Sequence, residues 1–237
     1  MRRKILLVLG VICLLAVGAV VWINKFLLAN FISVKNIVCK TQYGPCGQQD
    51  VKLASRFVGR NLFLVTSAEV DEILAQNFRN NKVYVNKVFP QTLSLFVEKR
   101  KGFVAVGKPS LGNGVFLVDS EGIVLSHEEN SALPVIVLSD DVANLVVGEK
   151  VSQDLLNAGK TLRLVSLAQK ANKAKLSKDA LIVDLMWDLN TINVIFPLEG
   201  DSKVVVGALQ LILTQAKMDG KIPKAIDLQY KNPVLKY

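Results

Sequence analysis

The residue with the clearest potential for acid–base chemistry is His127, the only histidine in this chain of 237 residues, which is followed by Glu128 and Glu129. A histidine can act as a general base near neutral pH when a reacting group lies within hydrogen-bonding reach. No nucleophile occurs at a diagnostic spacing from His127 in the sequence. The pattern therefore favours an exposed loop residue just after a strand over a catalytic base.

Four further carboxylates could be offered as a general acid and base: Asp119, Glu121, Asp140 and Asp141. Each stands in a turn-like sequence, where Asp and Glu are common for conformational reasons. The glycines at 112 and 114 are too sparse for a phosphate-binding loop, and no Lys-Ser or Lys-Thr pair follows them. The sequence therefore predicts no catalytic residue, no cofactor and no small-molecule substrate, and it favours a binding module over an anchored hydrolase.

Cys39 and Cys46 form the one local pair among three cysteines, and they flank a segment that ends in Gly-Pro. Such a turn can return the chain on itself, which would allow a disulfide between them. Two reduced thiols are the alternative, because the redox state depends on the compartment. A zinc site is not expected, since the only histidine is remote and the cysteine spacing is not that of a zinc knuckle.

An unbroken apolar run of 19 residues, Ile5–Ile23, follows three basic residues at the start of the chain. A helix of this length spans the hydrocarbon core of a bilayer, and basic residues keep their end of the helix in the cytoplasm. The sequence predicts a cytoplasmic tail at 1–4, a transmembrane helix at 5–23 and an exported remainder, a single-pass type II topology in the cell membrane. A cleaved signal peptide is the alternative, but its apolar core would be shorter.

The chain carries a net charge of +9. In an exported domain, that charge points to anionic lipid headgroups or wall polymers rather than to nucleic acid. The densest basic stretch, from Lys170 to Lys178, lacks the interleaved aromatic residues that stack on bases, so a solvated face is expected there.

Residues 31–100 have the pattern of a small unit in the order strand, helix, helix, strand, strand. A β-branched segment at 31–38 predicts the first strand, and apolar spacing at 50–58 predicts the first helix. The spacing of Thr66 and Glu69 fits a capping box at the start of the second helix. The apolar stripe of that helix is Val70, Ile73, Leu74 and Phe78. Alternating residues on either side of Phe89-Pro90-Gln91 then predict a hairpin.

Residues 102–237 mix short strands with two amphipathic helices, so this second unit is predicted to be α+β. The expected strands are 115–119, 123–125, 135–138, 181–185, 192–196 and 225–230. One helix has its apolar stripe at Leu155, Ala158, Leu162, Val165 and Ala168, and the other, starting near Ser202, has its stripe at Val205, Leu209, Ile212 and Ala216.

Several local strings, in this order, resemble the FtsQ/DivIB family of bacterial cell-division proteins. They are Asn61–Val65, the Phe-Pro-x-Thr-Leu hairpin with its charged segment at 88–100, Leu117-Val118-Asp119 with Gly122, and the closing strings 226–230 and 232–234. The resemblance implies a single transmembrane helix, a POTRA domain at 31–100 and a β-domain at 102–237. The Cys39–Cys46 loop and the absence of a proline after the charged segment depart from the family pattern.

The resemblance also implies a non-enzymatic scaffold of the divisome, at the division septum, that links early and late division proteins. Its partners would be small bitopic coiled-coil proteins of the FtsB/DivIC and FtsL type, bound through the β-domain. A POTRA-bearing component of a transport or secretion assembly is the alternative.

The closing strand is the predicted partner-binding surface, because a terminal strand at or near a sheet edge can pair with a strand from another protein. The residues expected to form it are Ala225, Ile226, Asp227, Leu228, Gln229, Tyr230, Pro233, Val234 and Leu235. Specificity would come from Ile226 and Leu228 or, on the other face, from Asp227 and Gln229. For the side chains of Ile226 and Leu228 themselves, burial in the core is favoured over a role in binding, whereas for the backbone edge of the strand binding is favoured.

Overall fold

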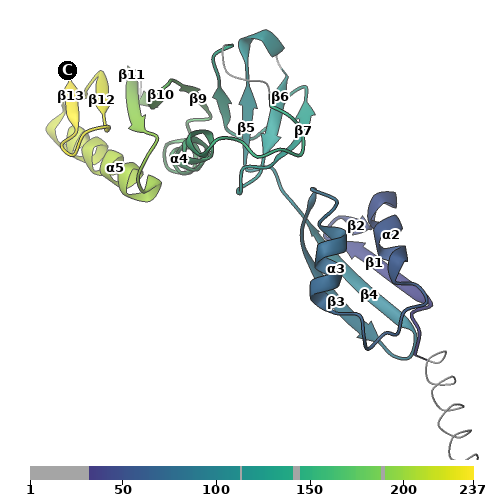
Figure 1. Cartoon of the computed structure of the whole chain (residues 1–237). Helices are drawn as coiled ribbons and strands as arrows, with labels where there is room; N and C mark the ends of the chain where they lie inside the picture. Colours follow the sequence, from purple (N-terminus) through teal and green to yellow (C-terminus); the bar gives the residue numbers. More distant parts are fainter. Residues whose placement is uncertain (1–31, 113, 141–144, 188–189) are drawn as a thin grey trace, which may run out of the picture. The chain divides into compact units, whose positions relative to one another are not determined.

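A computed structural model describes residues 32–112, 114–140, 145–187 and 190–237. The chain divides into two compact units with a boundary between Lys99 and Arg100 (Figure 1). Strands and helices occur in both units, so the predicted α+β class is confirmed. The predicted tail at 1–4 and membrane helix at 5–23 lie outside the described residues. Within the described ranges, no helix combines the length and the apolar character that a membrane crossing requires.

The first unit has a four-stranded sheet with helices on one face (Figure 1). The strand order is β2 (Gly44–Pro45), β1 (Asn36–Thr41), β4 (Thr92–Lys99) and β3 (Asn80–Val88), with β1 parallel and β3 antiparallel to β4. The helices are α2 (Gln48–Ala54) and α3 (Ser67–Leu74), and a 3₁₀ turn at Ser55–Phe57 follows α2. Leu93, Leu95 and Val97 of β4 are buried against the helices, as the alternation predicts.

Three elements of the first unit have boundaries that differ from the sequence prediction. The helix predicted at 50–58 is α2 (Gln48–Ala54) followed by the 3₁₀ turn at Ser55–Phe57. The first strand begins at Asn36 rather than at residue 31, because the chain before it pairs elsewhere: the Val34 N–H bonds to the carbonyl of Arg60. The second helix begins as predicted, with Thr66 Oγ1 accepting from the Glu69 N–H, but it ends at Leu74. Phe78 therefore lies outside its apolar stripe.

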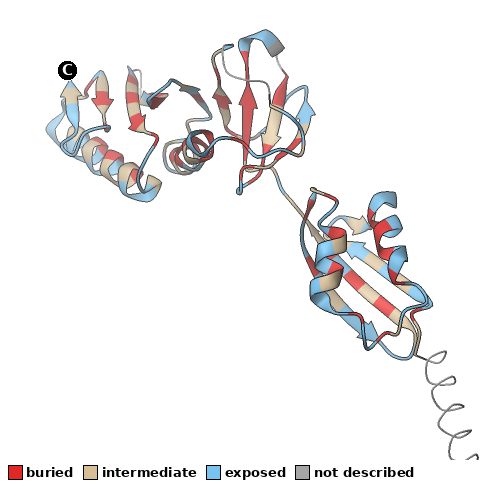
Figure 2. Ribbon diagram, viewed as in Figure 1, coloured by how far each residue is buried: buried red, intermediate tan, exposed pale blue. Residues whose placement is uncertain are grey.

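The second unit has a nine-stranded sheet among its described residues. The strand order is β13 (Val234–Lys236), β12 (Ala225–Asp227), β11 (Asn190–Pro197), β10 (Ala180–Trp187), β9 (Lys173–Leu176), β8 (Val135–Val137), β5 (Val104–Gly107), β6 (Val115–Val118) and β7 (Val124–Glu128). Its helices are α4 (Gln153–Gln169) and α5 (Ser202–Asp219), and a 3₁₀ turn lies at Pro109–Leu111. Buried residues alternate with less buried ones along the long strands (Figure 2).

The six strands and two helices predicted for this unit are present, while β5, β9 and β13 are additional. The β9 strand lies inside the lysine-rich stretch, where Ala174 is buried between the exposed Lys173 and Lys175. The buried stripe of α5 is Val206, Leu209 and Leu213, so the helix is rotated slightly from the predicted stripe. In α4, Ala168 of the predicted stripe is exposed, whereas Leu155, Ala158, Leu162 and Val165 are buried.

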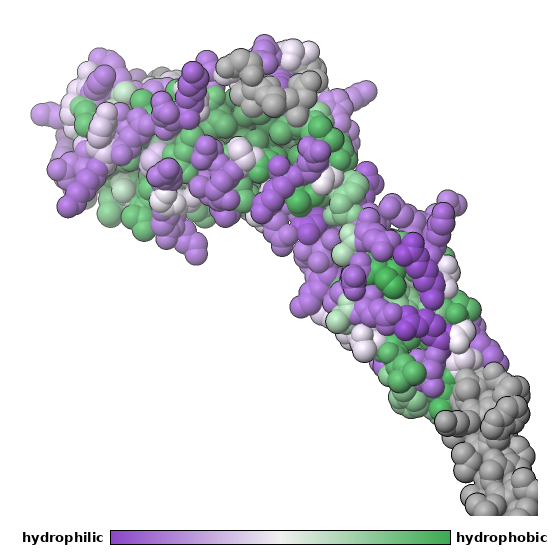
Figure 3. All heavy atoms as spheres, viewed as in Figure 1, coloured by the Kyte–Doolittle hydropathy of each residue, from purple (hydrophilic) through white to green (hydrophobic). Residues whose placement is uncertain are grey.

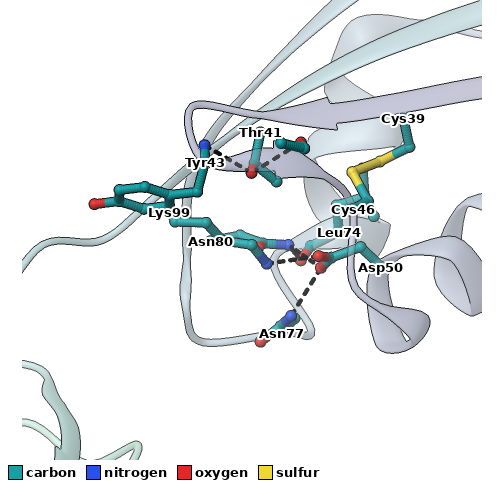
Figure 4. Close-up of a disulfide and its surroundings, with 10 residues drawn as sticks. Cys39, Thr41, Tyr43, Cys46, Asp50, Leu74, Asn77, Asn80 and Lys99 are labelled. Atoms are coloured by element: carbon teal, nitrogen blue, oxygen red, sulfur yellow. Dashed lines mark hydrogen bonds and ion pairs between the residues drawn. A yellow bond between two sulfur atoms is a disulfide. The ribbon is translucent and has the colours of Figure 1, made fainter.

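A buried carboxylate connects four elements of the first unit (Figure 4). Asp50 of α2 is 1% exposed and accepts from Lys99 Nζ at 2.6 Å, at the end of β4. The side-chain amides of Asn77 and Asn80 donate to its other oxygen at 2.7 and 3.0 Å. Asn80 also donates to the Leu74 carbonyl at the end of α3. A charge this deeply buried is stable only when it is paired and hydrogen-bonded, so these contacts hold the helices on the sheet.

A disulfide joins Cys39 of β1 to Cys46 just after β2 (Figure 4). In the hairpin that it closes, Gln42 exchanges two hydrogen bonds of 2.9 Å with the backbone of Lys99. The two alternatives left open by the sequence are thus resolved in favour of the bonded pair. By the chain-entropy account, so small a loop contributes about 2.5 kcal/mol.

Replacing Asp50 with Asn should lower the free energy of unfolding of the first unit by about 3 kcal/mol, because the Lys99 ammonium loses its buried partner. Urea denaturation of the full chain, followed by hydrogen exchange in β3 and β4, measures this. Glu69→Gln is the matched control: it breaks the exposed Arg60–Glu69 pair and should cost less than about 1 kcal/mol. If the two variants lowered the free energy of unfolding equally, the stabilising role assigned to the buried Asp50–Lys99 pair would be contradicted.

The same carboxylate should make the unit sensitive to acid. Burial opposes ionisation of Asp50, but hydrogen bonds from Lys99, Asn80 and Asn77 outweigh it and hold the pKa below the ordinary 3.8. The stability it provides is therefore complete above the unfolded-state pKa and is lost as the pH falls through the lower, folded-state pKa. The difference in stability between the wild type and Asp50→Asn should shrink over that acidic range.

The disulfide predicts the thiol count of the purified protein. Under denaturing conditions without reductant, a maleimide should modify only Cys13, and after reduction it should also modify Cys39 and Cys46. Mass spectrometry distinguishes one adduct from three. Three adducts before reduction would show that the pair is not bonded in the isolated protein.

Candidate partner-binding surface

The candidate surface is built by the last 18 residues, which follow α5. That helix ends at Gly220, whose left-handed φ of +65° lets its N–H bond back to the Ala216 carbonyl, a conformation favourable for glycine. The buried Pro223 then leads into β12, which pairs in parallel with β11, Ile226 opposite Val194. This short connection fixes the register of the closing strand against the core.

The predicted strand 225–230 is not the edge of the sheet. Its regular part ends at Asp227, because the Asp227 carboxylate accepts from the Gln229 N–H and turns the chain. The chain then returns as β13, antiparallel to β12, with Asp227 opposite Val234. Backbone pairing thus covers β12 on both sides, and the edge passes to Val234–Lys236.

Side-chain burial separates the predicted residues into two groups. Ile226 is 0% and Leu228 is 6% exposed, and both belong to the core that α4 and α5 cover. They therefore stabilise the sheet, and a partner cannot reach them. Asp227 points to the opposite face and is half-buried, and Ala225 is also half-buried.

The remaining predicted residues lie on the turn and the edge strand. Gln229 is exposed, but its amide nitrogen donates to the Asp179 carbonyl at 3.0 Å, which ties the turn to the neighbouring loop. Tyr230 and Pro233 are exposed on the turn, Val234 is exposed on β13, and Leu235 is half-buried.

A continuous row of side chains crosses the sheet on the face opposite the helices. The strand register aligns Val234, Asp227, Ile195, Ile182 and Lys175 across five strands. None of the five is buried, whereas their neighbours along each strand point into the core. The row combines exposed or half-buried aliphatic groups with one carboxylate and one ammonium group. Ile182, Ile195 and Lys175 were not among the predicted site residues, although the alternation along their strands marks the face they occupy.

Two of the carboxylates considered for catalysis, Asp119 and Glu121, are held by Arg100. Asp119 is 3% exposed, pairs with Arg100 at 2.6 Å and accepts from the backbone N–H groups of Glu121 and Ile123. Glu121 also pairs with Arg100. Burial disfavours the charged form of Arg100, but hydrogen bonds to Glu121 and Asp119 raise its pKa above the usual value. These contacts close the turn between β6 and β7.

The other candidates are also dispersed. His127 lies in the edge strand β7, not in a loop, and its ring centroid is 4.8 Å from that of Phe116. Asp140 accepts from Ser110, which lowers the pKa of its carboxyl group, and Asp141 lies outside the described residues. In the part of the chain that the structure describes, no three His, Cys, Asp or Glu residues are grouped so that they could hold a metal ion.

No protein-family model matches the sequence, and no curated protein matches it either. The assignment of a surface therefore depends on the residues and their geometry.

Truncating Ile226 to Ala should lower the free energy of unfolding of the second unit by about 3 kcal/mol, because it opens a cavity under the sheet. Val234→Ala is the matched control: this side chain is 44% exposed, and its loss should cost less than about 0.5 kcal/mol. Chemical denaturation measures both. If Ile226→Ala lowered the free energy of unfolding only slightly, the Ile226 side chain would again be a candidate for the binding surface.

Proposed function

We propose that the chain is a membrane-anchored scaffold of the FtsQ/DivIB type that captures a partner strand at β13. The observation that carries the proposal is the position of Val234–Lys236 at the edge of the nine-stranded sheet, with a backbone partner on one side only among the described strands. Edge N–H and C=O groups favour pairing with another chain. Such β-augmentation needs no catalytic group.

The face beside this edge supports the same use. A partner strand adding to β13 would continue the row of Val234, Asp227 and Ile195, so its own side chains would meet an aliphatic surface with one carboxylate. Backbone bonds would then supply affinity, and contacts with Asp227 would supply selectivity.

The element order supports the family-level proposal. In the first unit, β1, α2, α3, β3 and β4 follow the strand, helix, helix, strand, strand order implied for a POTRA domain. The second unit would then be the β-domain. On this proposal the protein is a non-enzymatic, single-pass type II protein of the cell membrane at the division septum, and its partners are small bitopic coiled-coil proteins of the FtsB/DivIC and FtsL type.

Proline substitutions in β13 test the edge directly. Neighbouring residues of a strand direct their N–H groups to opposite sides. Of the variants Val234→Pro and Leu235→Pro, one therefore removes an N–H that faces β12, and the other removes an N–H that faces outward, toward the open edge. The variant that loses the outward donor should reduce capture of the bitopic partner from membranes in mild detergent at least about tenfold, with unchanged circular dichroism.

The matched controls are Ser126→Pro and His127→Pro in β7, the other edge of the same sheet, which should retain capture. Full capture by both β13 variants in folded protein would refute the proposed surface. Mass spectrometry of the captured protein decides between the alternatives, because a pore-forming or polymerising partner would indicate a transport assembly.

A further inference from the structure

Four exposed hydrophobic side chains gather at one end of the first unit. Phe63 and Leu64 are 61% and 72% exposed in the loop before α3, and Val88 and Phe89 are 45% and 60% exposed where β3 turns toward β4. The rings of Phe63 and Phe89 are 6.2 Å apart, so the loop and the turn form one surface. We call these four residues the apolar tip.

The apolar tip surrounds the point where the described chain begins. The Leu62 N–H donates to the Ile32 carbonyl, and Ser33 forms a β-bridge with Asn61, so the entering chain lies beside the loop. The Lys35 N–H donates to the Gln91 carbonyl, which places the same segment beside the turn. Hydrophobic residues gather at this end of the unit in Figure 3.

Only eight residues, 24–31, separate Ile32 from the apolar run Ile5–Ile23. Fully extended they span roughly 28 Å at most, and as a helix they would span about 12 Å. If the run is anchored in a bilayer, the apolar tip cannot move far from the surface of that bilayer. A short tether of this kind gives the lipid surface a high effective concentration at the tip.

The charges around the apolar tip fit a lipid headgroup layer. Lys35 is exposed near the turn, and Lys87 Nζ lies 3.0 Å from the Phe63 carbonyl. Arg60 stands before the loop, paired with Glu69. A hydrophobic patch rimmed by basic side chains is the composition with which peripheral segments enter an anionic membrane interface.

We propose that the apolar tip inserts into the boundary between headgroups and acyl chains of the membrane that holds the predicted anchor. The inference rests on the membrane anchoring in the proposed function, and it adds a second membrane contact that is independent of partner capture. Two contacts instead of one tether would fix the orientation of the first unit on the bilayer. The disulfide hairpin, at the other end of β1, would face away from the lipid.

Fluorescence quenching in proteoliposomes tests the contact. The full chain carries Trp22 and Trp187, so the background for the probes is Trp22→Phe with Trp187→Phe. Leu64→Trp places the probe in the apolar tip. Tyr43→Trp is the matched control, because Tyr43 is also 72% exposed but lies in the disulfide hairpin. The bilayer is phosphatidylcholine with phosphatidylglycerol, with or without bromine on the acyl chains.

Brominated lipid should quench Leu64→Trp at least about twofold and leave Tyr43→Trp nearly unchanged. Adding Lys35→Glu and Lys87→Glu should reduce the quenching, because it reverses the charge that faces the anionic headgroups. Equal, weak quenching of both probes would overturn the proposal and leave the patch as a site for a protein partner, which the purified system lacks.

The anchor is tested separately by Trp22 in a chain that carries only Trp187→Phe. Quenching of Trp22 without quenching of Leu64→Trp would refute the tip contact and leave the anchored scaffold standing. Absence of quenching at both Trp22 and Leu64→Trp would refute the anchor and the tip contact together. Capture at β13 is measured with different variants, so its loss or retention does not affect this result.

Discussion

Backbone hydrogen bonding is the constraint on which the second unit depends. The backbone N–H and C=O groups of a strand are all paired within the sheet only when it has a neighbour on both sides. Among the described strands of the nine-stranded sheet, only β7 and β13 have a single neighbour. The chain extends the sheet by one strand at its end, because Asp227 stops β12 and the turn sends Val234–Lys236 back along it. The strand that completes the core is thereby paired on both sides, and the edge strand beside it has no fully buried side chain.

In the first unit, too, the contacts that stabilise the fold and the exposed hydrophobic residues lie in different places. Around Asp50, one carboxylate, one ammonium group and two amides satisfy one another, and the disulfide closes the adjoining hairpin. The exposed Phe63 and Phe89 lie at the other end of the unit, in the loop before α3 and the turn after β3. The polar, cross-linked end therefore adds to the stability that the core gives the unit, and the proposed membrane contact would use the apolar end.

Three of the carboxylates considered for catalysis are bonded to other groups of the protein. Asp119 and Glu121 are held by Arg100, and Asp140 is bound to Ser110. A carboxylate already bonded to backbone N–H groups is poorly placed to exchange a proton with a substrate. The exposed edge strand β13 and the row of side chains beside it form one continuous surface, whereas the carboxylates are dispersed. For that reason the proposed function is binding rather than catalysis.

The sequence by itself determined the α+β class, the β3–β4 hairpin and the Thr66 cap, because these follow from local periodicity and spacing. It also led to the proposal of a binding region within residues 225–235, which stays a prediction. Only the tertiary structure decided that Ile226 and Leu228 are buried, that Val234–Lys236 is the edge, and that Ile182 and Ile195 share its face. Those facts depend on which strands become neighbours across long stretches of chain, and a three-residue strand carries too little pattern to predict its neighbour.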